Sequence, residues 1–188
     1  NVTGVQTCAL PISFYFVQLA SYLERKEIQP DSEWAALREA QNKALHLCNT
    51  GMAVAIDIGD ANDIHPKNKQ EVGRRLSLLA LQKTYGKGKV TDIMSYKDYV
   101  VENDKVRLIF EGNTKGFQPS DLLTGFTIAG ADHVFYPAKA QIKGNELLVW
   151  SPDVSNPVAV RYGWADNPDC NLYDRTGFPV APFRTDCW

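Results

Sequence analysis

The sequence predicts an α/β segment followed by an all-β segment. In the first half, up to about Gly86, apolar runs of strand length alternate with stretches whose apolar residues recur at helical spacing. In the second half, short strand signals are separated by turns rich in Gly, Asn and Asp, and no internal repeat is present. This order predicts the end of an α/β sheet and then a β-sandwich.

The composition is that of an ordinary globular protein, and it narrows the range of partners. Of the 188 residues, 44% are hydrophobic and 22% are charged, and the formal net charge is -2. Because the chain has no basic stripe, we expect no nucleic-acid partner. No apolar run approaches the length of a membrane span. Apart from Cys8, the cysteines Cys48, Cys170 and Cys187 show no CxxC spacing, which argues against a zinc site, although Cys170 and Cys187 could pair in an oxidising compartment.

The N-terminal residues follow neither a helix nor a strand period. Residues 2–12, VTGVQTCALPI, match the translation of a short-read sequencing adapter. A segment of that origin is not part of the natural protein, so it predicts nothing about the fold. We therefore expect residues 1–13 to be an unstructured artefact, with the protein proper beginning at Phe14. A reading frame interrupted in this way would leave the C-terminal remnant of a longer protein.

Two strands are predicted between residues 14 and 88. The aromatic run 14–19 is interpreted as a buried strand. The continuous apolar run 52–56 is typical of a parallel strand that is covered on both faces. The stretches after these two runs have helical spacing, so the order is strand, helix, strand, helix.

Both helices have recognisable ends. Asp31 or Ser32 is expected to cap the first helix. Leu47 and Cys48 are expected near its end, and Asn49-Thr50-Gly51 ends it. The second helix is predicted over residues 68–85 and is closed by Gly86.

The second half, residues 89–188, is predicted to be a β-sandwich with an irregular but ordered tail from residue 165. The expected strands cover residues 98–101, 106–110, 125–129, 134–137, 140–142, 147–150 and 158–164.

The loop of residues 57–66 is the candidate site for chemistry. It connects a buried strand to a helix, and ligands of open α/β sheets bind at the carboxyl ends of strands. Pro66 suits the first helical position, which would put His65 at the positive end of the helix dipole. A carboxylate from Asp63 or Asp60 would offset that effect and leave one ring nitrogen free as a general base. A polar turn with a solvated histidine explains the same residues without any chemistry.

Several longer strings resemble one family of esterases. FVQLA, WAALREAQ and NTGMAVAIDIGDANDIHPKNKQEVGRRL are similar to the C-terminal part of the sialate O-acetylesterase family. FTIAGADHVFYPAKAQI, NPVAVRYGWADNP and NLYDRTGFPVAPFRTD continue the resemblance to the end of the chain. It implies that residues 14–88 are the C-terminal part of a flavodoxin-like, SGNH-type hydrolase sheet. It also implies a periplasmic or secreted protein.

The resemblance implies removal of O-acetyl groups from sialic acid or related sugars by a serine esterase, without metal or organic cofactor. His65 matches the catalytic histidine of the family. Related hydrolases carry Asp three residues earlier, where this chain has Asn62, so the orienting group stays open between Asp63, Asp60 and a backbone carbonyl. The nucleophilic serine and the oxyanion hole belong to upstream motifs of the family. The fragment alone is therefore expected to be inactive without the missing N-terminal part of the same chain.

Two alternative functions remain, an acetylxylan esterase and a non-catalytic carbohydrate-binding β-sandwich module.

Arg38 and Glu39 are expected on a solvated or salt-bridged helix face. Trp164, Asn167 and Tyr173 would either form a platform for a sugar or pack the tail against the sandwich, and packing is the expected outcome.

Overall fold

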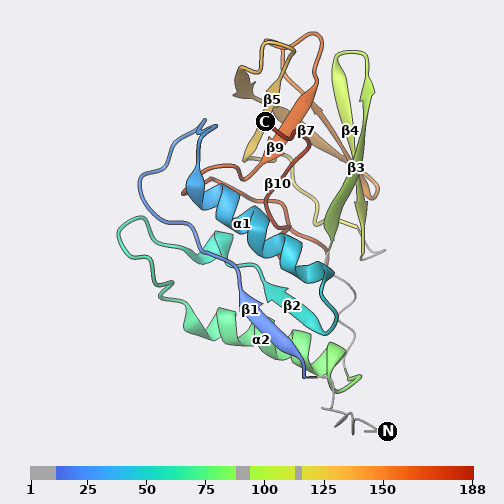
Figure 1. The fold of residues 1–188 in the computed structure, drawn as a ribbon. Helices are drawn as coiled ribbons and strands as arrows, with labels where there is room; N and C mark the ends of the chain where they lie inside the picture. The colour runs from blue at the N-terminus through green and yellow to red at the C-terminus, as the bar shows by residue number, and fades with distance from the viewer. Residues whose placement is uncertain (1–11, 88–93, 113–115) are drawn as a thin grey trace, which may run out of the picture.

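The structure is a computed structural model that describes residues 12–87, 94–112 and 116–188. It is built mostly of strands with few helices, and an α/β part precedes an all-β part (Figure 1). For residues 1–11, the expectation of an unstructured segment lies outside the described residues. Ser13 accepts a hydrogen bond from the hydroxyl of Thr84 at 3.1 Å. Ile12, the first described residue, is 82% exposed.

Two parallel strands and two helices form the α/β part. Phe14 of the first strand lies opposite Thr50 of the second, and α2 packs against both strands. A parallel pair needs a long crossover, and here the crossover contains the first helix. The elements of this part are β1 (Phe14–Val17), α1 (Glu33–Lys43), the 3-10 helix η1 (Ala44–His46), β2 (Thr50–Ala53), the 3-10 helix η2 (Ile56–Ile58) and α2 (Lys69–Lys83).

Side-chain caps fix the start of both α-helices. The Ser32 hydroxyl accepts a hydrogen bond from the backbone N–H of Ala35 at 3.0 Å. The Asn68 side chain does the same for Glu71 at 3.1 Å. Each bond satisfies one of the N–H groups that a helix start leaves without a partner. Ser32 is therefore a cap, as predicted, and α2 begins one residue after the predicted position 68.

The predicted extents of the first helix and the second strand were wrong. α1 ends at Lys43 and passes into η1, well before Gly51. β2 covers Thr50–Ala53, whereas the apolar run 52–56 was expected to be the strand. Residues 54–56 are buried, but 54 and 55 lie beyond the end of the strand and Ile56 already begins η2. Burial therefore continues past the end of the ladder, and an apolar run alone does not mark that end.

The all-β part consists of two four-stranded antiparallel sheets, ordered β3-β4-β8-β7 and β10-β9-β5-β6. In β4 and β8 every second residue is buried, and these side chains join those of β5, β9 and β10 in one apolar cluster. The strands are β3 (Ser95–Glu102), β4 (Lys105–Glu111), β5 (Phe126–Ala129), β6 (Phe135–Pro137), β7 (Lys139–Lys143), β8 (Glu146–Trp150), β9 (Ala159–Tyr162) and β10 (Phe183–Arg184).

Arg38 joins the two parts, which corrects the expectation of a solvated position. Its side chain is fully buried, whereas the neighbouring Leu37 is 50% exposed. Its guanidinium donates to the carbonyls of Leu19, Ala20, Ala165 and Asp166 at 2.7–2.9 Å. These carbonyls lie in irregular segments where no sheet partner satisfies them, so the helix turns its arginine inward.

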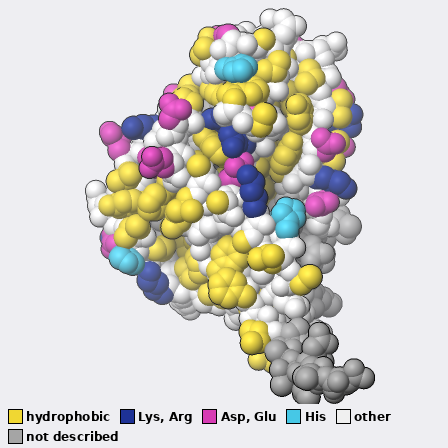
Figure 2. Space-filling model, in the orientation of Figure 1, with side chains coloured by type: hydrophobic (Ala, Val, Ile, Leu, Met, Phe, Trp, Pro, Cys, Tyr) yellow, Lys and Arg dark blue, Asp and Glu magenta, His cyan; other side chains and the backbone are white. Residues whose placement is uncertain are grey.

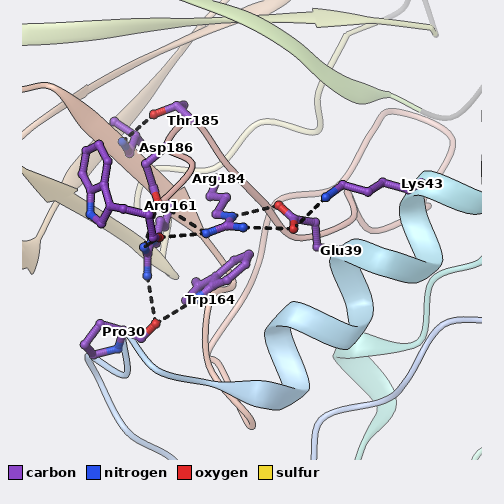
Figure 3. Close-up of polar contacts among 10 residues, drawn as sticks. Pro30, Glu39, Lys43, Arg161, Trp164, Arg184, Thr185 and Asp186 are labelled. Atoms are coloured by element: carbon purple, nitrogen blue, oxygen red, sulfur yellow. Dashed lines mark hydrogen bonds and ion pairs between the residues drawn. The ribbon is translucent and has the colours of Figure 1, made fainter.

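A network of charged and aromatic side chains ties the C-terminal tail to α1 (Figure 3). Arg161 is 3% exposed and donates to both carboxylate oxygens of Asp186 at 2.8 Å. Arg184 contacts Glu39 of α1 at 2.8 Å, so Glu39 is salt-bridged as expected. Both guanidinium groups lie near the indole of Trp164, at 5.0 and 4.7 Å from its centroid.

Apolar side chains are exposed on the face that carries α1 and β1, where Figure 2 shows hydrophobic patches. Phe14, Leu37 and Leu47 are 64%, 50% and 68% exposed. Among the described residues β1 pairs only with β2, so its other edge is open.

Cys170 and Cys187 are not joined, so the disulfide considered from the sequence does not form. Cys170 Sγ lies close to Gly125, just before β5, and to Gly163, just after β9. Cys187 is exposed at the end of the tail, and both cysteines are free thiols.

Candidate functional site

The loop between η2 and α2 is held closely against the segment that follows β1. A Cβ atom at Gly59 would lie 2.1 Å from the carbonyl oxygen of Ser21, so only glycine fits at this approach. The Ser21 hydroxyl donates to the carbonyl of Ile56 at 2.6 Å. The backbone N–H of Leu23 donates to the carbonyl of Ala61 at 3.1 Å. These contacts fix the first half of the loop.

Asp63 and His65 lie side by side in this loop. One oxygen of Asp63, Oδ1, accepts a hydrogen bond from the backbone N–H of His65 at 2.9 Å and lies 3.2 Å from Nδ1 of the ring. A ring that carries its proton on Nδ1 donates it to this oxygen and leaves Nε2 free to accept a proton. The His65 backbone N–H, followed by the imidazole, lowers the pKa of Asp63, so this carboxylate stays ionised near neutral pH. The His65 side chain is 79% exposed.

Asp60 is engaged elsewhere. Its carboxylate contacts the ammonium group of Lys67 at 2.6 Å and accepts from the backbone N–H of Asn62 at 3.0 Å. The Lys67 contact is the main reason why the pKa of Asp60 is lowered. Of the two candidate carboxylates, the structure therefore brings Asp63 and not Asp60 to the imidazole. Within the described residues, no backbone carbonyl and no serine hydroxyl is bonded to the His65 ring.

His65 does not lie at the first turn of α2, contrary to the sequence-based interpretation. The helix begins at Lys69 with Asn68 as its cap, so Pro66 is not its first residue. Lys67, between His65 and the cap, contacts Asp60 across the loop, and the helix begins only after the Asn68 cap. The dipole of the helix therefore acts on His65 from a greater distance than we expected, and this effect is confined to the first turn.

A buried cluster below the loop was missed by sequence reasoning. Arg75 of α2 is 3% exposed and contacts Asp57 through two hydrogen bonds, at 2.6 and 2.7 Å. The hydroxyl of Tyr173 donates to the same carboxylate at 3.2 Å. Arg75 also donates to Glu71 at 2.8 Å. Only the position of Asp57 directly after an apolar run hinted at this cluster, because its partners come from a helix and from the distant tail.

The three residues considered as a sugar platform do not form one surface. The Trp164 indole N–H donates to the carbonyl of Pro30 at 3.0 Å, and the Asn167 amide donates to the carbonyl of Leu23 at 2.8 Å. Together with the Tyr173 contact to Asp57, these bonds pack the tail against the α/β part. Packing was expected, but against the sandwich, so the predicted partner was wrong. Trp164 also lines a cleft of 330 Å³ between residues 25–27 and the start of β5.

Among residues 12–87, 94–112 and 116–188, no three His, Cys, Asp or Glu side chains lie close enough together to hold a metal ion. No helix in this described part of the chain has the length and apolar character needed to cross a bilayer.

Comparison with known proteins relates the chain to esterases that act on acetylated carbohydrates. It is 27% identical to mouse (Mus musculus) sialate O-acetylesterase over 191 residues and 29% identical to the rat (Rattus norvegicus) protein over 192 residues. A crystal structure of a carbohydrate acetylesterase from Xanthomonas citri superposes with a TM-score of 0.86 at 46% identity. No family model matches the sequence.

The matched proteins are all longer than this chain. The alignments cover 90% of the chain but 35% of the mouse and rat proteins, and 94% of the chain but 41% of the solved structure. In fold and sequence the chain is similar to carbohydrate esterases. Among these, the homologues support a sialate O-acetylesterase-like family.

Proposed function

We propose that this chain supplies the general base of a carbohydrate O-acetylesterase, with His65 as the base and Asp63 as its orienting carboxylate. The observation that carries the proposal is the Asp63–His65 contact in a loop that follows a parallel strand. The names of the homologous proteins support an acetylated sugar as the substrate. Because the chain spans about a third of its curated relatives, the activity is proposed for a longer protein that contains it.

The roles follow from ordinary acyl-transfer chemistry. Nε2 of His65 takes the proton of a serine hydroxyl while the serine oxygen attacks the acetyl carbonyl. The resulting imidazolium then returns this proton to the leaving sugar oxygen. Asp63 keeps the ring in the tautomer with the proton on Nδ1 and stabilises the imidazolium during the reaction. In this proposal the serine and the donors for the oxyanion belong to the remainder of the longer protein.

The test uses the longer protein, with 4-nitrophenyl acetate, an O-acetylated sialic acid and an acetylated xylan as substrates. We expect His65→Ala to lower kcat by several orders of magnitude on each accepted substrate. His46→Ala changes another exposed histidine and serves as the control, with activity unchanged. Near-normal turnover in His65→Ala would refute the proposal. Comparing kcat/KM for the two sugars separates a sialate esterase from an acetylxylan esterase.

A second substitution tests the role of Asp63. Asp63→Asn keeps the size of the side chain but removes its charge. We expect a large loss in kcat with little change in KM, because the carboxylate matters most when the imidazolium forms. Full activity of this variant would exclude Asp63 as the orienting group.

A further inference from the structure

We propose that the tail segment of residues 170–181 is a positioning element for the His65 loop and that it acts through Tyr173, Asp57 and Arg75. This inference rests on the proposed role of His65. It gives the C-terminal tail a part in catalysis, although the tail contributes none of the reacting groups.

The first step is the way in which Arg75 ties together the two ends of the loop. At the strand end, its guanidinium donates to the carbonyl of Val54 at 2.5 Å and to both oxygens of Asp57. At the helix end, it donates to Glu71 of its own helix at 2.8 Å. A planar guanidinium that binds a carboxylate through two parallel bonds also fixes the orientation of that carboxylate.

The second step is the contact of the tail with the buried Arg75–Asp57 pair, which we call the clamp. Tyr173 donates to the Asp57 oxygen that also accepts from Arg75 Nη2. Burial, with Asp57 nearby, raises the pKa of Tyr173 to about 12, so the phenol remains a donor throughout the neutral range. A few residues on, the ring of Phe178 lies 5.6 Å from the guanidinium carbon of Arg74, the neighbour of Arg75 on α2. The tail therefore contacts both the start of the loop and the helix that follows it.

The third step is apolar packing at the same place. Met52, Val54 and Ile56, which lead from β2 into the loop, form one buried cluster. Cys170 and Ala181 pack against this cluster and mark the two ends of the tail segment. The tail therefore packs directly against the strand end that leads into the loop.

The fourth step is the contrast between this clamp and the surface of the loop. The clamp is buried, with Arg75 and Asp57 side chains 3% and 10% exposed. The cross-loop pair Lys67–Asp60 is on the surface, with the lysine 77% exposed, and solvent weakens such pairs. We infer that the buried clamp, rather than the surface pair, determines how firmly Asp63 and His65 are held together.

The test uses the 188-residue chain itself. At alkaline pH, ¹⁵N NMR shows which nitrogen of the His65 ring carries the proton. We expect the unmodified chain to favour the tautomer with the proton on Nδ1. Tyr173→Phe removes one hydroxyl, and we expect it to reduce this preference and speed amide exchange in residues 60–66 by roughly tenfold, as loss of one charged hydrogen bond would. Tyr99→Phe makes the same chemical change on β3 and is the matched control.

Arg75→Lys provides the second arm, because an ammonium group cannot reproduce the paired bonds to Asp57. We expect at least the same loss of tautomer preference as in Tyr173→Phe. If this variant unfolds, Tyr173→Phe alone decides. The inference is overturned if Tyr173→Phe matches Tyr99→Phe in both tautomer preference and loop exchange. This outcome is distinct from failure of the proposed function, which is measured by turnover in His65→Ala of the longer protein.

Discussion

Replacing Arg38 with methionine tests whether one side chain holds the two parts of the molecule together. Methionine retains most of the length of arginine but can donate to none of the four carbonyls that Arg38 now binds. The carbonyls of Ala20 and Asp166 keep other donors, the Trp34 indole and the Tyr22 backbone. Those of Leu19 and Ala165 have no other donor among the described residues, so the substitution leaves them unsatisfied.

The expected loss of stability follows from two opposing contributions. A hydrogen bond from a charged donor contributes roughly 1.5 kcal/mol at the low end of the usual range, so four contribute about 6 kcal/mol. Burial acts against them, because it lowers the pKa of Arg38 to about 10. At about 1.4 kcal/mol per pKa unit, this offsets about 3 kcal/mol. We therefore expect Arg38→Met to lower the free energy of unfolding by about 3 kcal/mol, or Tm by roughly 6–12 °C for a chain of this size.

Thermal and urea unfolding followed by tryptophan fluorescence would measure this change. Arg107→Met is the control, since Arg107 has two ion pairs on the surface of β4 and its loss should leave Tm unchanged. The reasoning is refuted if Arg38→Met unfolds at the temperature of the unmodified chain or above it. That result would mean that the cost of burying the guanidinium is as large as the gain from its hydrogen bonds.

Two further predictions follow from perturbed ionisable groups. Arg74, and then Arg75, hold the pKa of Glu71 down to about 2, so its stabilising effect is complete above about pH 4.5 and is lost as the pH falls towards 2. Acid titration of unfolding should therefore show a smaller loss of stability over this range in Glu71→Gln than in the unmodified chain, and equal losses would contradict the assignment. Burial raises the pKa of the Cys170 thiol to about 12, so iodoacetamide at mildly alkaline pH should label the exposed Cys48 and Cys187 well before Cys170. Peptide mass mapping would detect the order, and early labelling of Cys170 would show that the thiol is accessible.

Local patterns predicted the parts of the fold that depend on neighbouring residues. The alternation of Val106, Leu108 and Phe110 placed β4, and the polar residues around Asn103 placed its hairpin turn. The spacing of Asp63 and His65 likewise predicted that the two side chains could meet. Such features depend on a few consecutive residues, and these residues are all visible in the sequence.

Interactions between distant segments were not predictable in the same way. Arg38 was expected on a solvated or salt-bridged helix face, but it is buried because carbonyls of the segment after β1 and of the tail accept hydrogen bonds from its guanidinium. Nothing near Asp57 identified Tyr173 as its partner, because 116 positions separate the two residues. In both cases, polar groups that come together only in the folded chain need hydrogen-bond partners. The residue pattern of a single segment does not show which groups these are.

The network around Arg161 has a practical consequence for where the chain can be shortened. Beyond Pro182 the tail contains only the two-residue strand β10, so a boundary chosen from secondary structure would treat these residues as dispensable. Trimming them would remove Asp186 and leave the guanidinium of Arg161 buried against the ring of Phe135, 4.2 Å away, without a counter-charge. An orphaned buried charge costs several kcal/mol, a large share of the stability of a small domain. The final residues therefore contribute to the stability of the sheet that contains β9 and β5.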